Sequence, residues 1–356
     1  MKSRAYKKFI VLVFLLGIII LILPSTIRMY KDNNTLIGTE SYFTLKVANL
    51  ISNEKAMPKE DPLSFGGRIF PYKVGFPYVI ASISSITKSS LVSSCKIISL
   101  ILGILTLLLV YLSLNKLKYN DKLKVLILSI IILSPPFIFS FSTCSNYSII
   151  IFLSALAFYL LLLNKNIYLV LSALLIASLG LFSFYMPLIF LAIIFLYIII
   201  KDKSKLKWFF ITFGLTILVI AYYNYLLLNL PFLYERLSFS LKEKSVNFVL
   251  NNLISDFGGK FGLSLFSIVL SLFGFKELWK NKYKNFHIYI IVILLIILSI
   301  YLNESLFYLN IIISIIAAIG LIRLINSRWE SSLIKNFLIL IILCGLVFSG
   351  FSYINI

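Results

Sequence analysis

The chain has 356 residues, of which 60% are hydrophobic and only 13% are charged, and its mean hydropathy is +1.02. Soluble domains carry about 25% charged residues, so the composition excludes a water-soluble globular protein. The formal net charge is +20. In a soluble protein that excess would indicate a nucleic-acid partner. Cytoplasmic loops of membrane proteins carry a Lys and Arg surplus for topological reasons, so we expect no nucleic acid to bind.

Eleven apolar runs are candidates for membrane-spanning helices, which need about 20 residues to cross the hydrocarbon core. They lie at residues 9–23, 91–114, 125–141, 147–163, 167–184, 187–200, 208–228, 261–278, 286–302, 306–325 and 333–351. A basic segment precedes the first run, as in a signal peptide. No small-residue cleavage site follows that run, so we predict a retained signal anchor. The sequence thus predicts an all-α polytopic integral membrane protein with a single membrane domain over residues 1–356.

A shorter apolar run at residues 75–87 contains several serines, and we expect a juxtamembrane helix there rather than a span. Counting it as a span would move the lysine-rich loops to the outside, against the positive-inside rule. With eleven spans and a cytoplasmic N-terminus, the cytoplasmic segments contain 20 of the 33 basic residues and only four of the 13 acidic ones. We therefore predict a multi-pass protein of the cell membrane with its N-terminus in the cytoplasm.

Two long loops fall on the outer face in this layout, at residues 25–90 and 229–260. They contain most of the remaining acidic residues. Long loops on a compact body are where binding and catalytic residues usually lie. We therefore look for function on the outer face.

The first outer loop contains the clearest helical pattern outside the spans. Apolar residues recur at helical spacing between positions 43 and 51, which predicts an amphipathic helix over residues 40–52 on the membrane surface. Thr39 would be its N-cap, and Glu40 would lie in its first turn. A purely structural role for Glu40 is to complement the helix dipole.

The segment Gly-x-Glu-x-Tyr-Phe-x-Leu-Lys-x-Ala at residues 38–48, just after the first predicted span, resembles the opening of the GT-C-fold glycosyltransferases. These polytopic enzymes take a sugar from a polyprenyl-phosphate or polyprenyl-diphosphate donor. They include oligosaccharyltransferase catalytic subunits and protein O-mannosyltransferases. The later segment Asp-Pro-Leu-Ser-Phe-Gly-Gly-Arg at residues 61–68 is similar to one in archaeal members. The resemblance implies a GT-C-like fold and implies that Glu40, the acidic residue of the motif, is catalytic.

Two further segments extend the resemblance. Residues 133–142 followed by Asn146-Tyr147 are similar to the exit of the family's third span, and residues 255–262 are similar to a later outer loop. Where oligosaccharyltransferases carry acidic residues in the second outer loop, this chain has Ser145 and Asn146, which argues against a fully liganded metal site. The Trp-Trp-Asp motif that reads the acceptor sequon is absent, as is a soluble C-terminal domain. We therefore do not expect N-glycosylation.

Sugar transfer from a lipid phosphate needs a base for the acceptor hydroxyl and cationic groups for the departing phosphate. Glu40 is the expected base. Asp61, which precedes a proline in a predicted turn, is expected to be a supporting carboxylate. The two carboxylates are also the candidate ligands for Mg²⁺ or Mn²⁺, because hard divalent cations prefer oxygen ligands.

Substrate and phosphate contacts are expected from Arg68, Tyr42, Asn146, Arg236 and Lys260. Arg68 follows a Gly-Gly turn and is preferred, because a guanidinium group binds phosphate oxygens in a bidentate manner. Contact with anionic lipid head groups is the alternative role for the three basic residues. The expected partners are a polyprenyl-phosphate-linked sugar, membrane lipid, and a glycan, lipid or protein acceptor.

Two other functions compete with a membrane-embedded glycosyltransferase that acts on an acceptor hydroxyl at the outer face. A polysaccharide polymerase with long outer loops would depend on loop arginines, and this chain has few of them. A lipid or glycan transporter would place ionisable residues within its spans, and the predicted spans are nearly free of them. The gathering of carboxylates on the outer face favours the enzyme.

We assign no role in the reaction to the cysteines or to one cluster of tyrosines. Cys95, Cys144 and Cys344 are far apart in the sequence and predict neither a zinc site nor a disulfide framework. The tyrosines at positions 222, 223 and 225, near the outer end of a predicted span, are typical of an interfacial aromatic belt.

Overall fold

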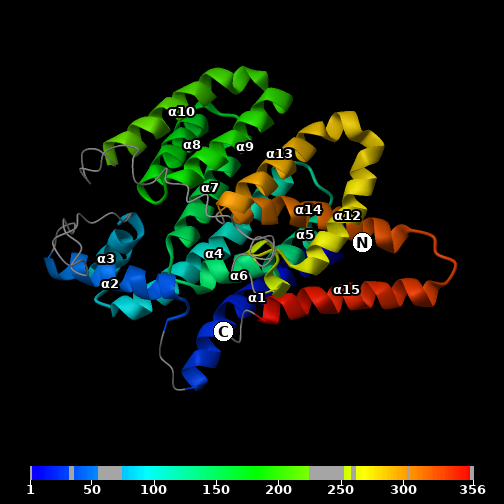
Figure 1. Cartoon of the computed structure of the whole chain (residues 1–356), viewed down its shortest axis with the longest axis horizontal. Coiled ribbons are helices and arrows are strands. Elements are labelled where there is room, and N and C mark those ends of the chain that lie inside the picture. Colours follow the sequence, from blue (N-terminus) through cyan, green and yellow to red (C-terminus); the bar gives the residue numbers. More distant parts are fainter. Residues whose placement is uncertain are drawn as a thin grey trace. The chain divides into compact units, whose positions relative to one another are not determined.

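The computed structural model describes residues 2–31, 36–54, 74–223, 252–257, 262–302 and 305–352 (Figure 1). These residues are almost entirely helical, which confirms the predicted all-α class. Outside the helices they contain one isolated parallel β-bridge, between Ile254 and Leu263.

The chain divides into two compact units, each assembled from segments that are distant in sequence. Unit 1 comprises Met1–Asp32, Val110–Phe139 and Glu243–Ile356, and unit 2 comprises Asn33–Leu109 and Ser140–Lys242. The prediction of one membrane domain over residues 1–356 stays a prediction.

Unit 1 is built from the N-terminal helix, one internal helix and the C-terminal helices. They are α1 (Lys2–Tyr30), α5 (Asp121–Ile132), the 3₁₀ turns η4 (Ser255–Phe257) and η5 (Trp279–Asn281), α12 (Leu265–Leu278), α13 (Lys282–Tyr301), α14 (Ser305–Asn326) and α15 (Ser332–Ser352).

Unit 2 contains the two helices of the predicted first outer loop and a group of apolar helices. They are α2 (Thr39–Glu54), α3 (Gly75–Thr87), α7 (Asn146–Leu162), α8 (Asn166–Ser178), the 3₁₀ turns η1 (Leu179–Leu181) and η2 (Lys203–Lys205), α9 (Tyr185–Lys201) and α10 (Leu206–Ala221). Two further helices, α4 (Leu91–Lys116) and α6 (Pro135–Ser142), extend from one unit into the other.

Among the described residues, five helices are long and apolar enough to cross a membrane, and a bent pair of helices makes a sixth candidate. The five are Lys8–Tyr30, Leu91–Lys116, Lys203–Ala221, Ser305–Asn326 and Ser332–Ser352. Several other predicted spans form apolar helices of only 10–17 residues. The protein is therefore a multi-pass helical membrane protein, whereas the count of eleven spans stays a prediction.

The bent pair consists of α5 and α6, which are inclined by 60° to each other at Ser134. The two prolines that follow explain the break, because proline cannot continue the hydrogen bonding of the preceding helix and disfavours helical backbone in the residue before it. The Ser134 hydroxyl is held by α14, where Asn310 Nδ2 donates to it at 2.8 Å.

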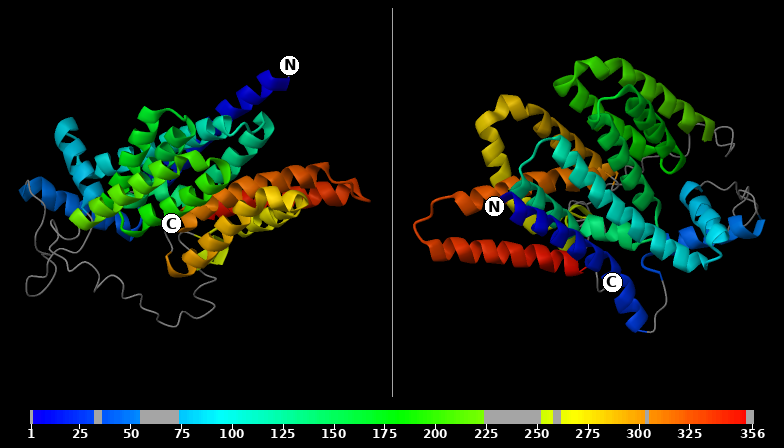
Figure 2. Two further views of the ribbon diagram at one scale, coloured as in Figure 1. Left: turned by 90° about the horizontal axis from the view of Figure 1, so that it is seen from above. Right: turned by 180° about the vertical axis from the view of Figure 1, so that it is seen from behind.

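In unit 1, α12 packs along α14 so closely that glycines are required at the contact (Figure 1, Figure 2). A Cβ atom on Gly274 would lie 2.0 Å from the Ile316 carbonyl oxygen, and one on Gly320 would lie 2.0 Å from the Leu270 carbonyl oxygen. Small residues at such positions let two backbones approach in a membrane bundle. The pair α12 and α14 is the centre of this unit.

In unit 2, α2 packs against α3 and presents one face to the interior. The predicted helix over residues 40–52 is confirmed, and its location on the membrane surface stays a prediction. Val47 and Ile51 are buried in the protein and Ser41 is completely buried, whereas Phe43 is 38% exposed. Ser41 thus belongs to the buried face of α2, together with Val47 and Ile51.

Candidate functional site

The candidate site begins at the N-terminus of α2, where Gly38 turns the chain into the helix. Gly38 has φ +78°, a backbone conformation that side chains with a Cβ rarely adopt. Glu40 lies in the first helical turn, as predicted. The helix begins at Thr39 itself, so the prediction of Thr39 as a residue preceding the helix is wrong. Its hydroxyl donates instead to Glu40 Oε2 at 3.3 Å.

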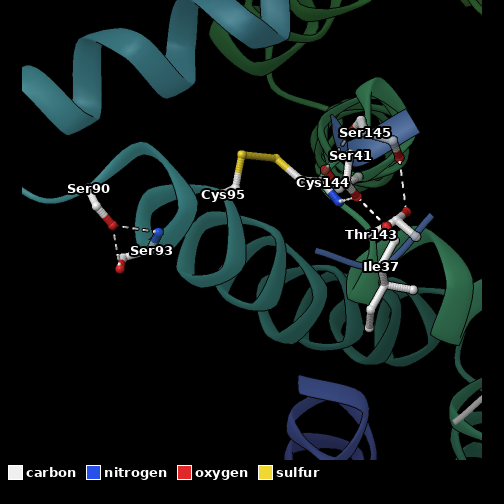
Figure 3. The surroundings of a disulfide bond; sticks show 9 residues. Ile37, Ser41, Ser90, Ser93, Cys95, Thr143, Cys144 and Ser145 are labelled. Carbon is white, nitrogen blue, oxygen red and sulfur yellow. Dashed lines mark hydrogen bonds between the residues drawn. A yellow bond between two sulfur atoms is a disulfide. The ribbon is translucent and has the colours of Figure 1, made fainter. Parts of the chain in front are cut away.

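The Ser41 hydroxyl joins this turn to the segment between α6 and α7 (Figure 3). Its Oγ donates to the Ile37 carbonyl oxygen and accepts a hydrogen bond of 2.8 Å from the Cys144 backbone N–H. Cys144 is 103 residues away in the sequence. The hydrogen bond therefore brings together two of the segments that resemble the GT-C glycosyltransferases.

The absence of a side chain at Gly38 leaves room for the Glu40 carboxylate. A Cβ atom on this residue would lie 3.1 Å from Glu40 Oε2 and 3.4 Å from Thr143 Cγ2. The carboxylate thus lies over the glycine turn, beside the segment that contains Thr143 and Ser145, whose hydroxyls are 3.3 Å apart. Glu40 is half-buried there.

A disulfide between Cys95 and Cys144 fixes this segment to the first turns of α4 (Figure 3). The prediction of no disulfide framework was wrong. The two cysteines are 49 residues apart in sequence, but their Cα atoms lie 5.3 Å apart because the start of α4 and the start of α7 meet at one end of unit 2. This distance is typical of disulfides. The spacing of the cysteines in the sequence does not predict this disulfide, because the pairing depends on how the helices pack.

Two other predicted substrate contacts lie within the described residues. Asn146 is the first residue of α7, two positions after Cys144, and its Nδ2 donates to the Phe182 carbonyl oxygen at 3.3 Å. Tyr42 is 46% exposed. Because successive helical residues are turned by about 100°, Tyr42 does not share the buried face of Ser41. The roles of Asn146 and Tyr42 stay predictions.

Tyr223, which the sequence placed in an aromatic belt, is part of the packing of unit 2. Its hydroxyl accepts a hydrogen bond of 3.0 Å from the Val74 backbone N–H, and the side chain is 2% exposed. The residue after Val74, Gly75, lies so close to Phe182 that a Cβ atom would be 2.9 Å from its ring. These contacts hold the start of α3 against the segment to which Asn146 donates.

Four predicted site residues, Asp61, Arg68, Arg236 and Lys260, lie outside the residues that the structure describes. Asp256, in the segment that resembles the family's later outer loop, is described and has a structural role. Its Oδ2 accepts a hydrogen bond of 2.6 Å from the Leu265 backbone N–H at the start of α12, and its Oδ1 accepts one of 2.6 Å from the Ser349 hydroxyl.

The described residues contain no group of three or more His, Cys, Asp or Glu side chains that could hold a metal ion. Glu40 is the acidic residue of the turn beside Ser41, and the segment that this turn contacts contributes the neutral residues Ser145 and Asn146. The second candidate ligand, Asp61, lies outside the described residues, so metal binding at this site stays a prediction.

Comparison with solved structures identifies the fold. The apo oligosaccharyltransferase of Archaeoglobus fulgidus superposes with a TM-score of 0.63 over 97% of this chain, at 13% sequence identity. The A. fulgidus oligosaccharyltransferase AglB in complex with an inhibitory peptide and a dolichol-phosphate gives a TM-score of 0.61 over 99% of the chain, at 14% identity. The A. fulgidus oligosaccharyltransferase in complex with Zn and sulfate gives 0.60 over 96%, at 15% identity.

The chain therefore has the fold of an archaeal oligosaccharyltransferase, the GT-C fold, as residues 38–48 implied. It spans about half the length of these structures, between 52% and 56%. No protein-family model and no curated protein sequence matches the chain.

Proposed function

We propose that this protein is a membrane-embedded glycosyltransferase that transfers a sugar from a polyprenyl-phosphate-linked donor to an acceptor hydroxyl on the outer face of the membrane. The observation that carries the proposal is the position of Glu40. In a chain with the fold of an oligosaccharyltransferase, the one acidic residue of the first-loop motif lies at a helix N-terminus beside the segment at residues 143–146.

In the proposed reaction, the Glu40 carboxylate accepts the proton of the acceptor hydroxyl. The hydroxyl oxygen then forms a bond to the anomeric carbon of the donor sugar, while the bond from that carbon to the phosphate oxygen breaks. The leaving group is the polyprenyl phosphate, which keeps the electron pair. Attack opposite to the leaving group inverts the anomeric configuration. A general base of this kind typically contributes about 10²–10⁴-fold to a rate.

The negative charge on the departing phosphate needs cationic partners. Arg68 is the proposed phosphate contact, with Arg236 and Lys260 as further candidates, and Asp61 as a second carboxylate. Tyr42 and Asn146 are proposed contacts to the donor or the acceptor. The AglB structure with dolichol-phosphate supports the class of donor, because dolichol-phosphate is a polyprenyl-type lipid phosphate.

Two observations support the outer face as the location of the site. The Cys95–Cys144 disulfide adjoins the turn that holds Glu40, and disulfides persist in oxidising compartments rather than in the cytosol. The Lys and Arg surplus of the other set of loops agrees with a cytoplasmic location for those loops. The proposed topology has eleven spans, a cytoplasmic N-terminus and a location in the cell membrane.

Replacing the proposed base tests the function. Purified protein in lipid nanodiscs, supplied with polyprenyl-phosphate sugars and a membrane extract as acceptor, should release polyprenyl phosphate. We expect Glu40→Gln to lower this release by at least about 100-fold, because the amide cannot accept the proton. The matched control is Glu54→Gln, the same substitution at the exposed C-terminal end of α2. This variant should keep full activity.

Equal activity of the wild type and Glu40→Gln would remove Glu40 from the mechanism. Absence of sugar transfer by the wild type with every polyprenyl-phosphate donor tested would contradict the proposed function itself. Movement of labelled lipid across proteoliposome membranes without transfer would favour a transporter.

A further inference from the structure

A second candidate site lies in unit 1 and is built from residues that the proposed reaction does not use. A cavity of about 520 Å³ opens between the C-terminal ends of α12 and α14 and the start of α5. Its lining is Leu123, Glu277, Lys280, Ile319, Ile322, Arg323, Asn326 and Ser327. The helix ends that form it adjoin the lysine-rich loops of the chain.

The charged residues of the cavity are arranged around one carboxylate. Glu277 Oε1 accepts a hydrogen bond of 2.9 Å from Lys280 Nζ, and Glu277 Oε2 lies 3.3 Å from Arg323 Nη1. The two cations and one anion leave the lining with an excess of one positive charge. Glu277 thus holds both cations at the cavity while neutralising only one of them.

Arg323 has hydrogen-bonding capacity to spare. Its Nη1 atom is buried and forms an ion pair with Glu277 Oε2 at 3.3 Å, while the side chain as a whole is 24% exposed. A guanidinium group carries five N–H donors, so donors other than those on Nη1 can serve an anionic oxygen in the cavity.

The cavity is apolar on one side and polar on the other. Ile319 and Ile322 precede Arg323 on α14, whereas Asn326 and Ser327 follow it at the end of the helix. The apolar residues face the cavity on the side of the membrane span, and the polar residues face it at the helix terminus. A molecule with a phosphate attached to a hydrocarbon chain matches this order, and a free phosphate ion matches only the polar half.

We propose that this cavity binds the phosphate group of an anionic membrane phospholipid. Arg323 donates to the phosphate oxygens, Lys280 adds a second positive charge, and the lipid's glycerol and first methylene groups pack against Leu123, Ile319 and Ile322. A guanidinium group suits this role because its planar donors match phosphate oxygens. The site is independent of the glycosyltransferase reaction.

Native mass spectrometry of the whole purified chain tests the proposal. The protein is titrated with phosphatidylglycerol and, separately, with the zwitterionic phosphatidylcholine. We expect wild type to bind one phosphatidylglycerol at least about tenfold more tightly than phosphatidylcholine, and we expect Arg323→Gln to lose that preference, because a charge-assisted hydrogen bond contributes about a tenfold factor or more. The matched control is Arg328→Gln, which removes the same charge five residues away at an exposed position outside the cavity.

Lys280→Gln provides a second test that does not disturb a buried group, because the Lys280 side chain is 62% exposed. Like Arg323→Gln, this variant should weaken phosphatidylglycerol binding. Equal weakening by Arg323→Gln and Arg328→Gln would overturn the site in favour of general surface charge. Equal thermal stabilisation of the protein by inorganic phosphate and by phosphatidylglycerol would overturn the assignment to a lipid.

Discussion

At the scale of single residues, the Ser41 hydroxyl connects the turn that contains Glu40 to the segment that contains Cys144. Ser41 is completely buried, and its Oγ serves both as a donor, to the Ile37 carbonyl, and as an acceptor, from the Cys144 N–H. It directly follows Glu40, so any movement of Ser41 moves the carboxylate. The precision of the Glu40 position therefore depends on a residue that has no chemical role of its own.

Replacing Ser41 with alanine should both destabilise the protein and impair it. The Cys144 N–H would lose its acceptor in a buried place, which lowers the free energy of unfolding by about 1–3 kcal/mol. Sugar transfer should fall with it, because the turn that holds Glu40 is no longer fixed. Thermal unfolding in detergent and the transfer assay measure the two effects.

Ser52→Ala, at an exposed position near the end of the same helix, is the control and should change neither quantity. If Ser41→Ala unfolded at the temperature of the wild type, the bond to Cys144 would contribute nothing to stability.

At the scale of secondary-structure elements, the packing of α12 on α14 depends on the absence of side chains. Lipid tails are as apolar as the helix surfaces, so helices in a membrane associate mainly through close van der Waals packing and interhelical hydrogen bonds. Gly274 and Gly320 permit that packing here, with backbone carbonyls of the partner helix 2.0 Å from where a Cβ would be.

Gly320→Ala should separate these two helices and lower the unfolding temperature, since the added methyl group meets backbone rather than a movable side chain. Overpacking of this kind typically lowers the free energy of unfolding by about 1–3 kcal/mol. Gly214→Ala in α10 is the matched control, because nothing lies within 4 Å of the added atom. It should be neutral or stabilising, because alanine favours helix more than glycine does. Equal unfolding temperatures for the two variants would contradict the close contact.

The elements were largely predictable from the sequence, whereas their contacts were not. Apolar runs of sufficient length predict helices because the membrane leaves the backbone few other ways to satisfy its hydrogen bonds. Every run predicted as a span contains a helix in the described residues. The break between α5 and α6 has a local cause in the proline pair at residues 135–136, within a run that was predicted as one span.

Interactions between distant segments followed no local pattern. The apolar periodicity of residues 43–51 gave no indication that Ser41 is buried, because its partner Cys144 is 103 residues away in the sequence. Tyr223 looked like an interfacial residue because nothing in its neighbourhood revealed Val74 as its partner. The motif that contains Glu40 was found from the sequence, but the residues that fix it were not.

At the scale of the whole molecule, the pairing of Cys95 with Cys144 makes a prediction about all three cysteines. Their Cα distance suits a disulfide, and Cys344 is exposed and free. Protein denatured without reductant should therefore react with one equivalent of a maleimide, and with three after reduction. Mass spectrometry counts the added groups. Cys344→Ser should reduce both counts by one, whereas three reactive thiols before reduction would rule out the bond.

The same bond has a consequence for the integrity of the chain after cleavage. Cys95 lies near the start of α4, and the exposed Lys116 and Lys118 lie at and just beyond its end, roughly 30 Å further along the helix axis. Limited proteolysis at these lysines from the lysine-rich side would cut the backbone between the two cysteines. Without a thiol the two fragments would migrate together on a denaturing gel, and with one they would separate. A single pair of gel lanes would thus report both the sidedness of the α4–α5 turn and the covalent link between the two fragments.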